Sequence, residues 1–182
     1  MRGHSLILSA LLVACGVGAA CAQEAKRTPD VVYVPTPQEV VEDMLRLTDV
    51  KKGDVLYDLG SSDGRIAVTA ARKYGVRAVG IDIDPERIRE ANENARQNGV
   101  QSLVQFRQQD LFAADFREAS VVTLYLLPDL NLKLLPRLQA QLKPGTRVVS
   151  HQFDMGDWRP DKVLESGGRT VYFWVMPAKK AR

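Results

Sequence analysis

A chain of 182 residues with 45% hydrophobic residues is long enough for one globular domain with a sizeable core. The formal net charge of +3 is small, and the basic cluster Lys179, Lys180 and Arg182 lies at the C-terminal end. This distribution excludes an electrostatic argument for DNA or RNA binding, so we expect no nucleic-acid partner.

The first 22 residues resemble a secretory signal peptide. Arg2 precedes an apolar run that ends at Ala22 in a small-x-small cleavage pattern. We therefore expect residues 1–22 to be a signal peptide and the protein to be exported to the periplasm. A polar linker at 23–32 then leads to a single domain at 33–182.

Two other interpretations of this first segment remain open. The 18 residues from Ser5 to Ala22 approach the lower limit for a membrane-spanning helix, and Leu12 to Cys15 resembles a lipoprotein processing box. We expect contact with a membrane only through such an uncleaved or lipidated N-terminus. Both cysteines, Cys15 and Cys21, lie here, so the domain itself has neither a disulfide nor a thiol nucleophile.

A dense helix-start pattern follows the linker. Thr36 is expected to be the N-cap, Pro37 the first helical residue, and Glu39 the residue that completes a capping box. The apolar residues that follow lie on one helical face, which predicts that this helix covers the sheet near the next motif.

The sequence DVLYDLGSSDG at 54–64 predicts a buried strand, a glycine-containing turn and the start of a helix. Gly60 and Gly64 bracket the turn, and the absence of Cβ atoms there would let backbone N–H groups approach a ligand closely. The turn is not the G-x-G-x-x-G of nicotinamide enzymes, because Asp58 stands two residues before the first glycine and Ser62 occupies the middle glycine position. The motif therefore predicts a nucleotide-binding turn of another kind.

A second strand is predicted within VRAVGIDIDP at 76–85, where it ends at Asp82. Asp82 lies 24 positions after Asp58, and an acid at the tip of a second strand suits a pair of ribose hydroxyls. The helix that follows has Asp84 as its cap and Pro85 as its first residue.

The rest of the chain completes an α/β pattern. We expect strands at 103–108, 120–127 and 146–153, a helix at 129–142, and a hairpin that turns at Gly167-Gly168. Too few residues separate the fifth strand from the hairpin for a crossover helix. The pattern predicts a mostly parallel sheet with helices on both faces and a C-terminal β-hairpin.

The turn at 54–64 resembles the D-x-G-x-G-x-G turn of class I S-adenosylmethionine-dependent methyltransferases, whose fold is Rossmann-like. Asp82 and the DLF of FRQQDLF follow in the order of that family. The strings YVPT, DLGSSDGR and SHQFDMGDW resemble a compact group that includes eukaryotic mitochondrial protein-lysine methyltransferases. Those relatives carry glycine where this chain has Ser62, and the N-P-P-Y motif of many amino-methylating enzymes is replaced by Tyr125-Leu126-Leu127-Pro128.

The resemblance implies S-adenosyl-L-methionine as cofactor and no metal. Asp82 would accept hydrogen bonds from both ribose hydroxyls, Asp110 and Leu111 would meet the adenine, and Gly60 would lie beside the methionine moiety. The residues implied in cofactor binding are Tyr33, Thr36, Asp58, Gly60, Ser61, Ser62, Gly64, Asp82, Asp110 and Leu111.

The acceptor site is expected beside Pro128, where the fourth strand ends. Tyr125 ends that strand, and His151, the only histidine beyond the signal segment, ends the fifth, so these two are the candidate catalytic residues. Trp158 could add an apolar or cation-binding wall. Purely structural roles for His151 and Trp158 remain open alternatives. The resemblance implies that the methyl acceptor is a nitrogen, that of a protein lysine.

Two other function classes remain alternatives. An exported module that binds a nucleoside or adenosylmethionine without turnover is suggested by the signal peptide, because adenosylmethionine is made in the cytosol. A dinucleotide oxidoreductase is disfavoured by the missing G-x-G-x-x-G.

Overall fold

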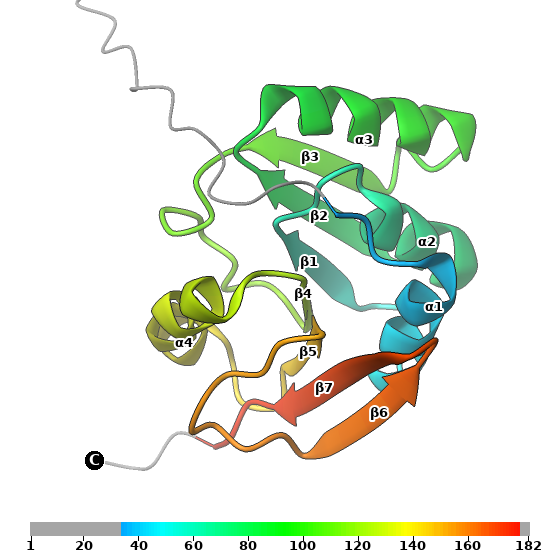
Figure 1. Cartoon of the computed structure of the whole chain (residues 1–182). Coiled ribbons are helices and arrows are strands. Elements are labelled where there is room, and N and C mark those ends of the chain that lie inside the picture. Colours follow the sequence, from blue (N-terminus) through cyan, green and yellow to red (C-terminus); the bar gives the residue numbers. More distant parts are fainter. Residues whose placement is uncertain (1–33, 179–182) are drawn as a thin grey trace, which may run out of the picture.

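The computed structural model describes residues 34–178, in which seven strands form one sheet in the order β3-β2-β1-β4-β5-β7-β6 (Figure 1). The strands are β1 (Val55–Leu59), β2 (Arg77–Asp82), β3 (Val104–Gln108), β4 (Val121–Leu124), β5 (Arg147–His151), β6 (Lys162–Ser166) and β7 (Arg169–Val175). The helices are α1 (Gln38–Leu47), α2 (Arg65–Tyr74), α3 (Pro85–Gln97) and α4 (Pro128–Gln141). The expected signal peptide, the linker, Tyr33 and the C-terminal basic cluster lie outside the described residues.

The sheet has a parallel part and an antiparallel end. β1 lies between β2 and β4, and β3 and β5 extend the parallel order on either side. β7 runs antiparallel to β5, and β6 pairs with β7 at the edge. This arrangement confirms the Rossmann-like α/β class with a C-terminal hairpin. The strand order reverses between β1 and β4, and such a switch point opens a crevice at the carboxyl ends of the strands.

Alternate residues of the central strands face two different layers. Leu56 packs in a cluster with α1 and α2, whereas its neighbour Tyr57 packs in a cluster with α4. Figure 1 shows α4 on one face of the sheet and α1, α2 and α3 on the other. Burial on both faces explains why the strands are almost continuously apolar in sequence.

The start of α3 agrees with its local sequence signals. Pro85 is the first helical residue, and Oδ1 of Asp84 accepts a hydrogen bond from the N–H of Glu86 at 2.9 Å. The cap holds the chain at the end of β2, so Asp82 and Asp84 are both presented at the crevice.

The predicted cap of α1 was wrong. The helix begins at Gln38, its N-cap is Pro37, and no side chain caps it. The hydroxyl of Thr36 instead lies 3.1 Å from Nδ1 of His151, a residue 115 positions away. A long-range hydrogen bond has replaced the local one.

The C-terminal hairpin was predicted correctly. Gly167 and Gly168 have φ values of +54° and +72°, the left-handed conformation that a two-residue type I′ turn requires at both positions. The segment from 152 to 161 contains no helix, so the chain returns beside β5 in the antiparallel direction. None of the helices between residues 34 and 178 combines the length and the hydrophobicity that a membrane span needs.

Candidate functional site

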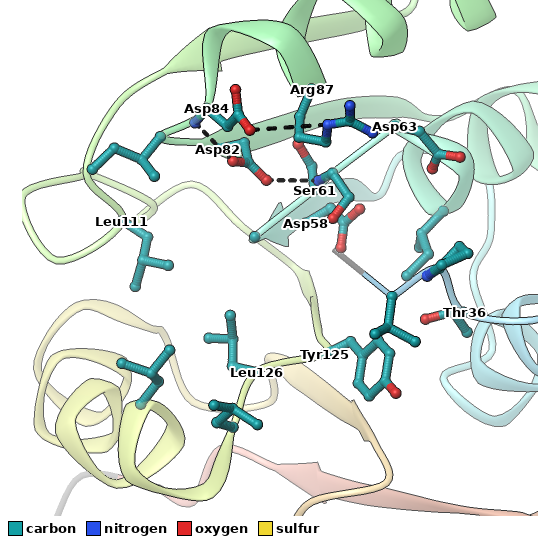
Figure 2. A pocket seen from close by; sticks show the side chains of 18 of the residues that line it. Thr36, Asp58, Ser61, Asp63, Asp82, Asp84, Arg87, Leu111, Tyr125 and Leu126 are labelled. Atoms are coloured by element: carbon teal, nitrogen blue, oxygen red, sulfur yellow. Dashed lines mark hydrogen bonds and ion pairs between the residues drawn. The ribbon is translucent and has the colours of Figure 1, made fainter. Parts of the chain in front are cut away.

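A cavity of about 270 Å³ opens at the carboxyl ends of β1, β2 and β4, at the point where the strand order reverses (Figure 2). The predicted site residues that line it are Thr36, Asp58, Gly60, Ser61, Ser62, Asp82, Asp110, Leu111 and Tyr125. Gly64 and His151 do not line it. The structure therefore brings together most of the predicted residues, although they come from segments far apart in the chain.

The turn after β1 is held by its own backbone N–H groups. Those of Gly60 and Ser61 donate to the carbonyl of Ile81 at 2.8 and 2.9 Å. The N–H of Ser62 donates to Oδ2 of Asp82 at 2.8 Å. The expectation that these groups approach a ligand was wrong, because pairing with β2 already uses them. The turn thus differs from phosphate-binding loops, whose N–H groups point at the ligand.

Asp82 ends β2 and faces the cavity (Figure 2). Its Oδ2 accepts from Ser62, and its Oδ1 accepts from the N–H of Asp84 at 2.9 Å. A carboxylate has about four lone-pair sites, so two remain for a ligand. The two backbone bonds fix the carboxylate without neutralising its charge, which suits recognition of two adjacent hydroxyls.

Asp58 is a buried carboxyl in the cavity wall. Burial raises its pKa to about 7, opposed by a hydrogen bond from the Thr123 hydroxyl at 2.7 Å and assisted by the negative charges of Asp63 and Asp82. Among residues 34–178, its Oδ2 and the nearby Oγ of Ser61 have no hydrogen-bond partner. Buried polar atoms of this kind are normally satisfied by a donor or acceptor from a ligand or solvent.

Backbone conformation explains two of the turn residues. Gly60 has φ of +85°, and a Cβ there would lie 2.8 Å from Cδ2 of Leu126, which lines the cavity. Ser62 also adopts the left-handed region, with φ of +49°, a conformation that glycine favours. Gly60 therefore serves the turn and the packing of Leu126.

Gly64 has a packing role. Its φ is +76°, and a Cβ would overlap the ring of Phe106 on β3. The glycine thus allows α2 to start close against the sheet, as the third glycine of nucleotide-binding turns does.

Residues 34–36, which we call the strap, form another part of the cavity lining. Nη1 of Arg65 donates to the carbonyl of Thr36 at 2.9 Å, while Nη2 of Arg65 forms an ion pair with Asp63 at 2.6 Å. Asp63 thus offsets the unfavourable position of the Arg65 cation at the start of α2. This pair also ties the strap to the turn.

An aromatic group lies across the cavity from the turn. The ring of Tyr125 lies 4.0 Å from that of His151 and 6.3 Å from that of Phe153, measured between centroids. Tyr125 and Phe153 line the cavity, with Leu127 and Leu130 beside them. We call these four residues the acceptor side, and the group of Asp58, Gly60, Ser61, Ser62, Asp82, Asp110 and Leu111 the cofactor side.

His151 supports this aromatic group from behind. It is fully buried, and burial, assisted by the charge of Arg169, lowers its pKa to about 4. The imidazole is therefore neutral at neutral pH. Within the described chain its Nε2 has no partner, while its Nδ1 is paired with Thr36.

Phe153 was missed by the sequence reasoning. Its N–H donates to the carbonyl of His151 at 2.9 Å around Gln152, whose φ is +69°. These features define the rarer, strained form of the γ-turn. Strain of this kind is often found at functional sites. Phe153 lay within the SHQFDMGDW string, but no local pattern distinguished it from the tryptophan five residues later.

The structure does not bring Trp158 and Pro128 into the cavity lining. Trp158 packs beside Trp174, with ring centroids 5.5 Å apart, and its carbonyl accepts from Nε1 of Trp174 at 2.7 Å. Pro128 begins α4. Both residues therefore have structural roles, and Phe153 occupies the place expected of Trp158.

The charge of the cavity lining is mainly negative. It contains the carboxyls of Asp58, Asp63, Asp82, Asp84 and Asp110, and the guanidinium groups of Arg65 and Arg87. Both arginines form ion pairs, Arg65 with Asp63 and Arg87 with Glu90, each at 2.6 Å. The lining suits a ligand with positive charge and hydroxyl groups better than a phosphate.

These features fit S-adenosyl-L-methionine. Asp82 can receive the ribose hydroxyls, Leu111 offers an apolar contact, and Oδ2 of Asp58 can accept from an ammonium group. The chemistry such a cofactor supplies is an activated methyl group on a sulfonium. The residues of this chain need to bind it, orient it and exclude water.

Comparisons with known proteins agree with this assignment. A family model described as "ANTKMT methyltransferase domain" matches residues 58–162. A protein-lysine N-methyltransferase of Saccharolobus islandicus is 46% identical over 84% of this chain and 98% of its own length. A lysine N-methyltransferase of Mus musculus, named for a subunit of ATP synthase, is 31% identical over 95% of this chain and 69% of its length.

A solved structure gives further support. An RNA methyltransferase from Salinibacter ruber, in complex with S-adenosyl-L-homocysteine, has a TM-score of 0.79 and 58% sequence identity, covering 82% of this chain and 97% of that one. Its complex implies that the corresponding cavity here binds S-adenosylmethionine. The chain therefore belongs to the ANTKMT methyltransferase domain family and is a class I S-adenosylmethionine-dependent methyltransferase.

Proposed function

We propose that the protein methylates the side-chain nitrogen of a lysine in another protein. The observation that carries this proposal is the 46% identity to a protein-lysine N-methyltransferase over nearly the whole of that relative. The mouse relative, which according to its name modifies a lysine of ATP synthase, supports the same acceptor.

The acceptor side has the chemistry that a lysine side chain requires. Tyr125, Phe153 and Leu127 offer apolar and aromatic surface along which a four-carbon stem can lie. A lysine must lose its proton before it can attack a methyl group, and desolvation in an apolar cleft favours the neutral amine. His151 does not line the cavity and is fully buried behind Tyr125, so we assign it no direct proton transfer. Alignment and desolvation carry the reaction in this proposal.

RNA is the second candidate acceptor, because the 58% identical protein from Salinibacter ruber is described as an RNA methyltransferase. The acceptor side opposes RNA, because its four residues, Tyr125, Leu127, Leu130 and Phe153, include no cation that could pair with a phosphate backbone. This apolar and aromatic lining suits the aliphatic stem of a lysine better.

The non-catalytic module is not supported by these similarities, since the relatives named above are enzymes or carry a methyltransferase description. The two acceptor classes can be separated in one experiment. The purified domain is incubated with methyl-labelled cofactor and either a protein extract or total RNA, and the labelled atom is located by mass spectrometry. The Asp82→Ala variant, impaired in cofactor binding, is the matched control.

Label on lysine nitrogens that depends on Asp82 is the expected result. Label in RNA, or on carboxylate or hydroxyl oxygens, would overturn the lysine proposal. Tight binding of S-adenosylhomocysteine with no label in either extract would favour the non-catalytic module.

We also propose, from residues 1–22, that the protein is exported. The apolar run and the cleavage pattern before Gln23 support this proposal, and a membrane anchor is the alternative. Mass spectrometry of the mature N-terminus, combined with cell fractionation, tests both. A chain that begins at Gln23 in the periplasm is expected, and an intact Met1 in the cytosolic fraction would contradict export.

A further inference from the structure

Thr36 forms hydrogen bonds toward both sides of the cavity. Its carbonyl accepts from Arg65, which follows the turn on the cofactor side. Its hydroxyl pairs with Nδ1 of His151 at 3.1 Å, at the end of β5. Thr36 is only 4% exposed and His151 is fully buried, so the bond between them is shielded from water, whereas the bond from Arg65 is partly buried.

The second bond reaches the acceptor side through one more contact. The ring of His151 packs 4.0 Å from that of Tyr125 at an interplanar angle of 37°, and Tyr125 stacks in turn with Phe153. In the described chain, Nδ1 is the only ring nitrogen of His151 with a hydrogen-bond partner, since Nε2 has none. The rotation of the imidazole is therefore set by Thr36 and by packing.

Two residues beside the contact between Thr36 and His151 adopt locally unfavourable arrangements. Thr36, which precedes the N-cap Pro37, leaves α1 without a side-chain cap, although threonine is a favoured capping residue. Gln152, next to His151, adopts φ of +69° in a strained γ-turn. Both residues give up a favourable local conformation at the place where the strap meets the aromatic group.

We propose that Thr36 and His151 are positioning residues, whose hydrogen bond fixes the strap against β5 and holds the Tyr125 ring in the orientation that methyl transfer requires. The proposal rests on the methyltransferase activity and is independent of the identity of the acceptor. It concerns the acceptor side, because the carbonyl bond to Arg65 does not depend on the hydroxyl.

Substitutions at Thr36 separate this role from simple folding. Thr36→Val keeps the shape and removes the hydroxyl, whereas Thr36→Ser keeps the hydroxyl. Losing one buried hydrogen bond should lower the methyl-transfer rate by roughly threefold to tenfold in Thr36→Val. The dissociation constant of S-adenosylhomocysteine, measured by calorimetry, should change by a smaller factor than the rate, because the hydrogen bond from Arg65 to the Thr36 carbonyl remains, and Thr36→Ser should restore most of the rate that Thr36→Val loses.

A double-mutant cycle with His151→Phe tests the pairing itself. If both single variants break the same bond, the methyl-transfer rate of the double variant should be no lower than that of the slower single variant. Additive losses would overturn the proposal, as would equal impairment of Thr36→Ser and Thr36→Val.

An NMR measurement that needs no methyl acceptor makes the test of the hydrogen bond independent of the lysine proposal. Nitrogen NMR of the His151 ring, with S-adenosylhomocysteine bound, should give one Nδ1 signal that shifts in Thr36→Val and is retained in Thr36→Ser. An unchanged Nδ1 signal in Thr36→Val would overturn the hydrogen bond. If no acceptor is labelled by the unmodified protein, the lysine proposal fails, while this measurement still tests the hydrogen bond between Thr36 and His151.

Discussion

The two sides of the cavity are built in different ways. The cofactor side comes from the consecutive strands β1, β2 and β3 and the loops that follow them, and its main carboxylate, Asp82, is held by two backbone N–H groups. The acceptor side combines the loop after β4 and the first turn of α4 with Phe153, which follows β5, and it is supported by the strap through His151. One side depends on hydrogen bonds within neighbouring loops, and the other depends on packing between distant segments. Mutations on the cofactor side should therefore change cofactor binding, and mutations on the acceptor side should change the binding of the methyl acceptor.

The largest effect is expected on the cofactor side, from Asp82→Ala. A hydrogen bond to a charged group contributes roughly 1.5–3 kcal/mol, so binding of S-adenosylhomocysteine should weaken by about tenfold to a hundredfold. The variant also removes the acceptor for the N–H of Ser62, which adds to the loss. Calorimetry measures the dissociation constant.

The matched control is Asp115→Ala, which breaks an exposed ion pair with Arg117 outside the cavity. It should leave the dissociation constant unchanged. Normal binding by a folded Asp82→Ala variant would remove Asp82 from the cofactor side.

Gly60→Ala should have the next largest effect. A non-glycine residue in the left-handed region costs about 1–2 kcal/mol, and here the new Cβ would also meet Leu126 at 2.8 Å. Relief of this strain must move the turn, so we expect the dissociation constant of S-adenosylhomocysteine to rise by roughly fivefold to thirtyfold.

Gly53→Ala provides the comparison, because Gly53 has a similar φ of +96° with nothing within 4 Å of a Cβ. Gly53→Ala should lose stability through backbone strain alone, Gly60→Ala should lose more because of the added contact with Leu126, and only Gly60→Ala should bind more weakly. Equal binding by the two variants would show that the turn after β1 tolerates a side chain.

A pH dependence is expected from Asp58, whose pKa burial raises to about 7. The carboxylate form attracts the cationic amino group of S-adenosylhomocysteine, and the protonated form does not, so affinity should rise as pH increases through 7. About one tenth of the carboxyl is ionised one unit below its pKa, which corresponds to a gain of up to about tenfold between pH 6 and pH 8. His151, with a pKa of about 4, stays neutral over this range.

Calorimetry of the unmodified protein and of Asp58→Asn at several pH values measures this effect. The variant should show a nearly flat profile. A slope that persists in Asp58→Asn would assign the titration to another group.

The smallest effect is expected on the acceptor side, from Phe153→Leu. The variant keeps an apolar side chain but loses stacking with Tyr125, an interaction of about 0.5–1.5 kcal/mol. The KM for the acceptor should rise by roughly twofold to tenfold, with cofactor affinity unchanged. Steady-state kinetics measures this KM, with the extract fraction that becomes methylated in the labelling experiment as the acceptor.

Phe112→Leu is the counterpart, since Phe112 lines the cavity next to Leu111. It should weaken cofactor binding and leave the KM for the acceptor unchanged. If both variants changed the same parameter, the division of the cavity into two sides would be wrong.

Local patterns predicted the strands, the hairpin and most of the residues that line the cavity beside β1, β2 and β3. Asp84 and Pro85 start α3 as expected, and Asp82 stands at the end of β2. These predictions succeeded because a cap, a turn or a strand end depends on residues within a few positions of one another. The binding mode of the turn was predicted less well, because its N–H groups pair with Ile81 on the adjacent strand.

The sequence by itself determined the class of fold, the family resemblance and the acids that line the cavity. Only the tertiary structure decided that Thr36 pairs with His151 instead of capping α1, that Phe153 and not Trp158 lines the acceptor side, and that Gly64 packs on Phe106. The physical reason is that each of these contacts joins segments brought together only when the sheet forms. A side chain with both a local and a distant partner adopts the arrangement that the packed core favours.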